Sequence, residues 1–272
     1  MGEQRATSSR VALVAVRPLE TAAELAEASA LLASLWREPN GAPPVSSHLL
    51  RAMALTGNYV HGAFPPGGGL VGVTLAWAAP GRGADLHSHI TGVLARWQGR
   101  GVGRALKLHQ REWALRHGFT TVSWTFDPLV ARNAWFNLAR LGARPEAYLP
   151  DLYGEMSDGS AIEHESDRFL VRWEIEAELT NSPHVVSERE RPALLAAGPA
   201  GEPVPGSPPP SWQEATVEIP HDIAVMRRDR PELAAQWRAA SRQVFSAVLA
   251  GGGKVLGLDG ARRYVLAAGA DR

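Results

Sequence analysis

The sequence predicts an α/β fold in which short extended segments alternate with helices. Two extended segments, residues 58–64 and 70–77, flank a run of Pro and Gly, which predicts a hairpin. A further extended segment, residues 86–94, leads through a glycine-rich turn into a helical pattern over residues 102–117. Strand and helix patterns then alternate again, so the chain combines hairpins with strand–turn–helix units.

The N-terminal elements follow from local signals. The short apolar run at residues 11–16 predicts a buried strand. Thr21 and Glu24 have the spacing of a capping box, and apolar residues recur with helical spacing over residues 25–35. A loop rich in helix breakers is expected at residues 38–44, followed by a short helix at residues 47–55.

The elements after the glycine turn are predicted in the same way. Gly118 follows the helix of residues 102–117, and Gly142 follows a second helix at residues 133–141, as is common just beyond helix ends. β-Branched and aromatic residues predict strands at residues 121–126 and 169–175.

The domain organisation changes after about residue 180. We expect one main domain over residues 1–180, a Pro-rich linker or arm over residues 181–212, and a C-terminal appendage over residues 213–272. The predicted elements of the appendage are a strand at residues 216–219, a helix at residues 231–249 and a hairpin at residues 254–266. Because this piece is too small for a core of its own, it is expected to pack on the main domain or on a partner subunit, which leaves a homodimer through the arm open.

Composition limits the function classes. Lys plus Arg and Asp plus Glu each number 28, and this balance argues against a nucleic-acid partner. The two lysines and the abundance of Ala, Gly and Pro are typical of a GC-rich bacterial genome. No cysteine is present, which excludes disulfides, thiolate metal sites and a Cys nucleophile. The polar N-terminus and the lack of a membrane-length apolar run of about 20 residues predict a cytoplasmic protein without membrane association.

The most informative segment is the turn Gln98-Gly99-Arg100-Gly101-Val102-Gly103-Arg104. Alternating glycines at a helix start leave several backbone N–H groups directed at one point, and the helix dipole adds positive potential there. The ligand that fits such a turn is a phosphate or pyrophosphate. Three other interpretations are weaker. A dinucleotide fingerprint needs Gly where Arg104 stands, and a Walker loop needs Gly-Lys-Ser/Thr. The third interpretation is a glycine-rich loop without a ligand.

The turn resembles the acyl-CoA-binding signature of the GNAT superfamily of N-acyltransferases, Q/R-x-x-G-x-G/A, with Gln98, Gly101 and Gly103 at its defined positions. The order of elements over residues 11–177 is similar to that superfamily. The segments Trp124–Leu129, Arg132–Ala134, Tyr153-Gly154 and Asp167–Trp173 resemble a subgroup of predicted acetyltransferases with undefined substrate. The resemblance implies a mixed, mostly antiparallel sheet that is splayed at the cofactor and flanked by helices, here with a small C-terminal helix-plus-hairpin appendage.

The resemblance also implies residues that hold acetyl-CoA or another acyl-CoA. The strand before the turn would bind the pantetheine amides through its backbone, and the turn itself would bind the pyrophosphate. In relatives the start of the later helix faces the pantetheine. The implied residues are Thr91, Gly92, Val93, Gln98, Gly99, Arg100, Gly101, Val102, Gly103, Arg104 and Asn133.

The candidate general bases are two histidines on the strand before the turn. Period-two alternation places His87, His89 and Thr91 on one face, and relatives commonly carry a base near the position of His87. An imidazole that titrates near neutral pH suits deprotonation of an amine. The alternatives are hydrogen-bonded core histidines or a chelating pair. No third ligand has suitable spacing, so no metal is expected.

The general acid is less defined. In the superfamily a Tyr often stands four residues before the Gly that ends the later helix, and Leu138 occupies that position here. Tyr148, Tyr153 or water would have to serve, and Tyr153 is kept as a catalytic candidate. Asp127, which ends a strand before Pro128, is a further candidate, although it could instead cap the following turn.

Together these features predict an acyl-CoA-dependent N-acyltransferase that moves an acetyl group, or a longer group such as succinyl, to the amine of a small molecule or amino acid by direct attack. Two alternatives remain. The missing Tyr favours a catalytically silent acyl-CoA-binding module of the same fold, and the long C-terminal region favours an oligomeric interaction protein.

Overall fold

The structure is a computed structural model. It describes residues 14–36, 42–157, 163–178, 182–207, 209 and 211–269. The chain divides into two compact units, Met1–Val122 (unit 1) and Ser123–Arg272 (unit 2). The boundary falls inside strand β5, Thr121–Phe126. The predicted strand at residues 11–16 and loop at residues 38–44 lie partly outside the described residues.

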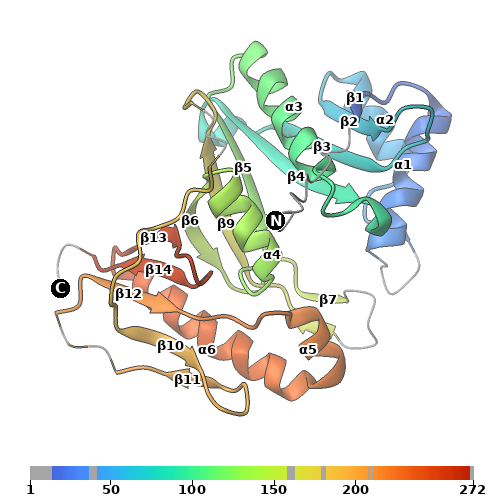
Figure 1. The fold of residues 1–272 in the computed structure, drawn as a ribbon. Coiled ribbons are helices and arrows are strands. Elements are labelled where there is room, and N and C mark those ends of the chain that lie inside the picture. Colours follow the sequence, from blue (N-terminus) through green and yellow to red (C-terminus); the bar gives the residue numbers. More distant parts are fainter. Residues whose placement is uncertain are drawn as a thin grey trace, which may run out of the picture. The chain divides into compact units, whose positions relative to one another are not determined.

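The described part of unit 1 is a four-stranded antiparallel meander with three α-helices (Figure 1). Its elements are β1 Ala15–Pro18, α1 Ala22–Leu35, α2 Ser47–Leu55, β2 Tyr59–Phe64, β3 Gly72–Ala78, β4 Asp85–Val93 and α3 Val102–Arg116, with 3-10 turns at Pro80–Arg82 and Ala95–Trp97. The predicted hairpin is confirmed as β2 and β3, which pair from Tyr59–Ala76 to Ala63–Gly72.

The two faces of this sheet carry different helices. Helices α1 and α2 bury an aliphatic cluster that includes Val60, Val73 and Leu75. Helix α3 covers the opposite face, where Val102 and Leu106 pack against Ala63. Apolar side chains at helical spacing on α3 therefore meet the alternate residues of the strands.

Helix α1 begins with the predicted capping box. The Thr21 hydroxyl accepts from the Glu24 N–H at 3.2 Å, and the Glu24 carboxylate accepts from the Thr21 N–H at 3.0 Å. These backbone hydrogen bonds, together with Arg17, lower the pKa of Glu24 to about 2. Side chains at the start of α1 thus accept hydrogen bonds from the backbone N–H groups of Thr21 and Glu24.

Unit 2 combines strands β5, β9 and β6, which are neighbours in that order, with a second, five-stranded sheet, the strand pair β7 and β8, and helices that include the long α6. Its elements are α4 Ala131–Ala134, a π-helical turn Trp135–Arg140, β6 Arg144–Leu149, β7 Glu155–Ser157, β8 Glu163–Glu165, β9 Arg168–Glu174, β10 Ala193–Ala197, β11 Pro203–Pro205, β12 Glu214–Val217, α5 Ile223–Asp229, α6 Pro231–Ala250, β13 Lys254–Leu258 and β14 Tyr264–Ala267. Strand β6 pairs antiparallel with β9. The sequence pattern did not predict β6, which contains Pro145.

The range predicted as a Pro-rich linker contributes two strands to the second sheet. Its order is β11-β10-β12-β14-β13, with β10 parallel to β12 and the other pairs antiparallel. Both Pro203 and Pro205 lie in β11 at the edge of this sheet, where a missing N–H removes no ladder bond. The prolines therefore mark a sheet edge as well as a connection.

The C-terminal elements share an aromatic core with the strands of unit 2. Phe245 of α6 lies 4.8 Å from Phe169 of β9 and 5.7 Å from Tyr148 of β6, measured between ring centroids. Tyr264 of β14 lies 5.7 Å from Phe169. Because these rings are buried together, the appendage is packed into unit 2.

Candidate functional site

The glycine turn has the backbone shape that its sequence predicts. Gly99 and Gly101 have φ angles of 72° and 86°, a region in which side-chain-bearing residues are strained. Gly101 is the N-cap of α3, and no side chain caps that helix start. A Cβ added at Gly103 would meet nothing within 4 Å, so α3 is open at this position of its first turn.

Gln98 ties this turn to the end of β4. Its side-chain amide donates to the carbonyl oxygen of Val93 at 3.0 Å, and its backbone N–H donates to Ala95. The guanidinium of Arg100 lies 5.5 Å from the ring centroid of Trp97. The signature Gln thus fixes the position of the turn, which leaves backbone N–H groups of the helix start to meet an anion.

Strand β4 contains a β-bulge at His89. Ile90 pairs with Leu75 and Ser88 pairs with Ala76, so His89 is an extra residue on β4. The prediction that Thr91 shares a face with the histidines is wrong because the bulge shifts the alternation. The Thr91 hydroxyl lies 2.8 Å from the Thr74 hydroxyl on the α3 face.

His87 and His89 do share a face, as predicted, and both contact one indole. The ring of Trp77 lies 5.3 Å from His87 and 4.9 Å from His89, on the face that carries α1. Burial lowers the pKa of His87, with a further contribution from His89, and burial also lowers the pKa of His89. Both imidazoles are therefore neutral at pH 7 and can accept a proton.

Gly92 allows α1 to approach the sheet closely. A Cβ at this position would lie 2.8 Å from Leu35, 3.0 Å from Trp36 and 3.2 Å from Leu32. Only Gly fits without displacing these side chains, so this residue sets the distance between β4 and α1.

Sequence reasoning missed Lys107, which is buried on the inner face of α3. Its ammonium donates to the Ser88 hydroxyl at 2.7 Å and to Gln110 Oε1 at 3.3 Å. Burial lowers the pKa of Lys107 to about 7. The available signal was its position beside Leu106 and Gln110, within the buried stripe of a helix in a chain with two lysines.

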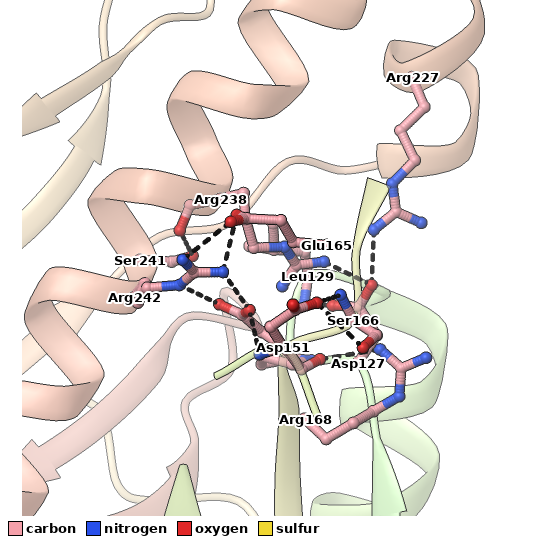
Figure 2. A network of polar contacts seen from close by, with 12 residues as sticks. Asp127, Leu129, Asp151, Glu165, Ser166, Arg168, Arg227, Arg238, Ser241 and Arg242 are labelled. Carbon is pink, nitrogen blue, oxygen red and sulfur yellow. Dashed lines mark hydrogen bonds and ion pairs between the residues drawn. The ribbon is translucent and has the colours of Figure 1, made fainter. Parts of the chain in front are cut away.

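In unit 2, the catalytic candidate Asp127 is bound on both carboxylate oxygens (Figure 2). Oδ2 accepts from Arg227 at 2.6 Å and from Arg238 at 2.7 Å, and Oδ1 accepts from the Leu129 N–H at 2.9 Å. Burial alone would raise the pKa of Asp127, but Arg238 and Arg227 outweigh it and hold the pKa well below its usual range. Asp127 is an ionised anchor of the turn that follows β5 and caps that turn.

The two tyrosines considered as acids differ in exposure. Tyr148 is buried and donates to Asp167, and burial together with that bond raises its pKa. Tyr153 is 48% exposed, and its hydroxyl lies 3.1 Å from the Thr125 hydroxyl of β5. The guanidinium of Arg168 lies 5.5 Å from its ring centroid. Tyr153 is therefore the accessible phenol of this pair.

The helix carrying Asn133 begins earlier than predicted and changes type. Asn133 lies in α4, is exposed, and donates its N–H to Val130. The following residues form a π turn, closed by a bond from the Leu141 N–H to Phe136 at 3.0 Å. Leu138 is fully buried within it. π-Helical turns are rare in proteins as a whole, and those that occur are often found at functional sites.

Two classes of site find no support in the described parts of the chain. They contain no group of three or more His, Cys, Asp or Glu that could hold a metal ion. Among their helices, none is long and apolar enough to cross a membrane.

Comparison with known proteins gives structural matches alone. No protein-family model matches the chain, and no curated protein sequence matches it. The matching solved structures include yncA, a putative acetyltransferase from Salmonella typhimurium with acetyl-CoA, at 16% identity, covering 62% of this chain and 98% of that one, with a TM-score of 0.49.

Two further matches are named acetyltransferases. A GNAT superfamily phosphinothricin acetyltransferase from Sinorhizobium meliloti in complex with AcCoA is 14% identical, covers 63% of this chain and 95% of that chain, and has a TM-score of 0.48. The ribosomal-protein-S18-alanine N-acetyltransferase from Escherichia coli is 15% identical and has a TM-score of 0.47. The match covers 62% of this chain and 98% of that chain.

Proposed function

We propose that this protein is an acyl-CoA-dependent N-acyltransferase that moves an acetyl group, or a longer group such as succinyl, to the amine of a small molecule or amino acid. The observation that carries the proposal is the helix start at Gly101–Arg104. Positive φ angles, an uncapped helix and open space at Gly103 coincide with the acyl-CoA signature at Gln98, Gly101 and Gly103.

The residues of the turn would hold the donor by its pyrophosphate. Backbone N–H groups from Val102 to Arg104 supply hydrogen bonds, and Arg100 and Arg104 supply positive charge. The backbone of Thr91, Gly92 and Val93 would bind the pantetheine arm, as the family resemblance implies. The family resemblance also implies Asn133 of α4 as a donor-binding residue.

The chemistry is direct attack of the acceptor nitrogen on the thioester carbon. The C–N bond forms, the C–S bond breaks, and CoA leaves as a thiolate. Neutral His87 or His89 would take the proton that the ammonium must lose, either directly or through water. The backbone N–H of Val93 would stabilise the oxyanion. Tyr153, exposed and bonded to Thr125, is the candidate that protonates the thiolate.

A pair of variants at Gly103 tests donor binding without straining the backbone. Gly103→Ala adds a methyl group to open space at a helical position and should preserve CoA affinity. Gly103→Glu places a carboxylate at a helix N-terminus, where it favours the helix but repels pyrophosphate. We expect CoA binding by calorimetry to be lost in Gly103→Glu alone. Equal affinity in both variants and the parent would reject the site.

The alternative is a silent acyl-CoA-binding module, which the buried Leu138 at the usual Tyr position favours. The two functions differ in turnover. Thiol release from acetyl-CoA or succinyl-CoA across a panel of amines supports the enzyme. Tight CoA binding without thiol release from either donor supports the silent module.

A further inference from the structure

Helix α3 buries polar as well as apolar side chains against strands β3 and β4 of unit 1 (Figure 1). Near its start, Val102 and Leu106 pack on Ala63. Further along, Lys107 and Gln110 are also buried, although both are polar. Because these two residues are three positions apart, they lie on the same side of the helix. A polar patch therefore interrupts the apolar inner face of α3.

Hydrogen bonds from this patch reach two neighbouring strands. The Lys107 ammonium donates to the Ser88 hydroxyl of β4 at 2.7 Å and to Gln110 Oε1 at 3.3 Å. Gln110 Nε2 donates to the Thr74 hydroxyl of β3 at 3.4 Å, and that hydroxyl lies 2.8 Å from the hydroxyl of Thr91 on β4. These five residues form a continuous polar clamp, which begins and ends on β4.

The bulge at His89 lies between the two β4 members of the clamp, Ser88 and Thr91. Ser88 and Ile90 pair with consecutive residues of β3, so no residue of β3, which the structure describes throughout, pairs with His89. His89 therefore lacks the restraint that ladder pairing with β3 gives to its neighbours. Contacts from α3 and β3 hold the strand on both sides of this residue instead.

An apolar patch would hold α3 on the sheet with less desolvation. Lys107 and Gln110 are at most 4% exposed, and burial lowers the pKa of Lys107 to about 7. Burying an ammonium costs desolvation that an apolar side chain such as Leu106 avoids. Hydrogen bonds restrict direction as well as distance, whereas apolar contacts are non-directional. The clamp therefore fixes the geometry of β4 where the ladder is irregular.

The imidazole of the bulge lies on the opposite face of the sheet. His89 is exposed there, whereas His87 is half-buried. Burial lowers the pKa of both, and the pKa of His87 also responds to His89 and to the charges of Asp85, Lys107 and Arg82. His89 is the more accessible of the two, which makes it the better placed to meet an acceptor amine.

We propose that the polar clamp positions His89 as the general base of acyl transfer by holding the β-bulge in place. This inference rests on the proposed function. The clamp residues Ser88, Lys107, Gln110 and Thr74 are positioning residues, because they act through the backbone of β4 and contact no reacting atom in this assignment. The clamp, the bulge and His89 all belong to unit 1.

Ser88→Ala tests the clamp while every ionisable side chain stays in place. The variant removes the hydroxyl that accepts from Lys107. We expect kcat for thiol release from acetyl-CoA to fall about tenfold at pH 7, since a general base must be held close to its target. The acidic limb of the pH–rate profile should move up toward 6.5, because a loosened bulge exposes His89 to water. CoA affinity by calorimetry should stay unchanged, because the glycine turn is intact.

Tyr59→Phe is the matched control, because it also removes a buried hydroxyl between α3 and the sheet. That hydroxyl lies 2.9 Å from His109 Nδ1 on α3, and Tyr59 belongs to β2, which is not a neighbour of β4. Its kcat and acidic limb should match those of the parent. If Ser88→Ala does not fold, Thr74→Val removes another hydroxyl of the clamp and Thr74→Ser keeps it, so the acidic limb should move in Thr74→Val alone.

A double variant assigns the effect to one imidazole. In a His89→Ala background, Ser88→Ala should cause no further loss of kcat, because the base that the clamp positions is already gone. Additive losses would overturn the proposal, since the clamp would then act through a residue other than His89.

The remaining outcomes separate this proposal from the proposed function. A parent that releases no thiol from acetyl-CoA or succinyl-CoA across a panel of amines would overturn the proposed function, and the positioning role with it. An active parent in which Ser88→Ala matches Tyr59→Phe would reject the positioning role alone. A fall in kcat of equal size at every pH, with the acidic limb unmoved, would also reject it, because looser packing accounts for such a loss.

Discussion

The two units bury positive charge in different ways. In unit 1, Lys107 is surrounded by the Ser88 hydroxyl and the Gln110 amide oxygen, and burial lowers its pKa to about 7. In unit 2, Arg227 and Arg238 share the carboxylate of Asp127, whose pKa they hold below its usual range. Charge in unit 1 can therefore change near neutral pH, whereas charge in unit 2 is fixed.

Removing residues 182–272 should have the largest effect on unit 2. The truncation exposes Phe169 and Tyr148 and leaves Asp127 buried without its arginines. We expect unit 2 to lose its cooperative fold, measured by circular dichroism and size exclusion. A truncated chain that is monomeric, folded and fully active would show that the appendage is dispensable.

Asp127→Asn removes the shared carboxylate at nearly constant volume. Two buried guanidinium groups then lack a counter-charge, and we expect a loss of about 3–5 kcal/mol in the free energy of unfolding. Urea denaturation at pH 7 measures it. Arg172→Gln, which breaks partly exposed ion pairs with Glu174 and Glu146, is the control and should cost less than about 1 kcal/mol. Similar losses in both variants would contradict the anchoring role.

Lys107→Met tests the titratable charge of unit 1. The pKa of Lys107 is about 7 in the fold against its ordinary value of 10.5, so the unfolded chain binds more protons between these two pH values. Stability of the parent should therefore rise with pH across this window, by on the order of 3 kcal/mol between pH 7 and 9.5. The variant should lose that slope in urea denaturation. A slope that persists in Lys107→Met would assign it to other groups.

The histidines of β4 are tested through the pH–rate profile. If one imidazole is the general base, its replacement by Ala should lower the rate about 10²-fold at neutral pH and less at high pH, where the amine deprotonates unaided. Because burial lowers the pKa of both, the acidic limb of the parent should lie below the ordinary value of 6.5. A loss of equal size at every pH would indicate packing against Trp77 instead.

Sequence predicted the elements of unit 1 well because their signals are local. The capping box at Thr21 and Glu24, the β2–β3 hairpin and the turn before α3 each depend on neighbouring residues. Strand β11 was missed because two prolines suggest a linker, and only its place at a sheet edge makes them tolerable.

The site was predicted unevenly for the same reason. The backbone shape at Gly99 and Gly101 follows from residue type, so the turn could be read from sequence. The partners of Asp127 come from residues 100 and 111 positions later in the chain, and no local pattern indicates them. The predicted face of Thr91 was wrong because the bulge in β4 depends on pairing with β3. The alternation of residues in the sequence does not indicate that pairing.

That bulge at His89 divides β4 into two segments of opposite phase. Before it, even-numbered residues such as Ser88 face α3, and after it, odd-numbered residues such as Thr91 do. A scan of substitutions along this strand should therefore change rhythm once, at His89. Deletion of that one residue would restore simple alternation along the strand, and Ser88 and Thr91 would each keep the helical layer that they face now.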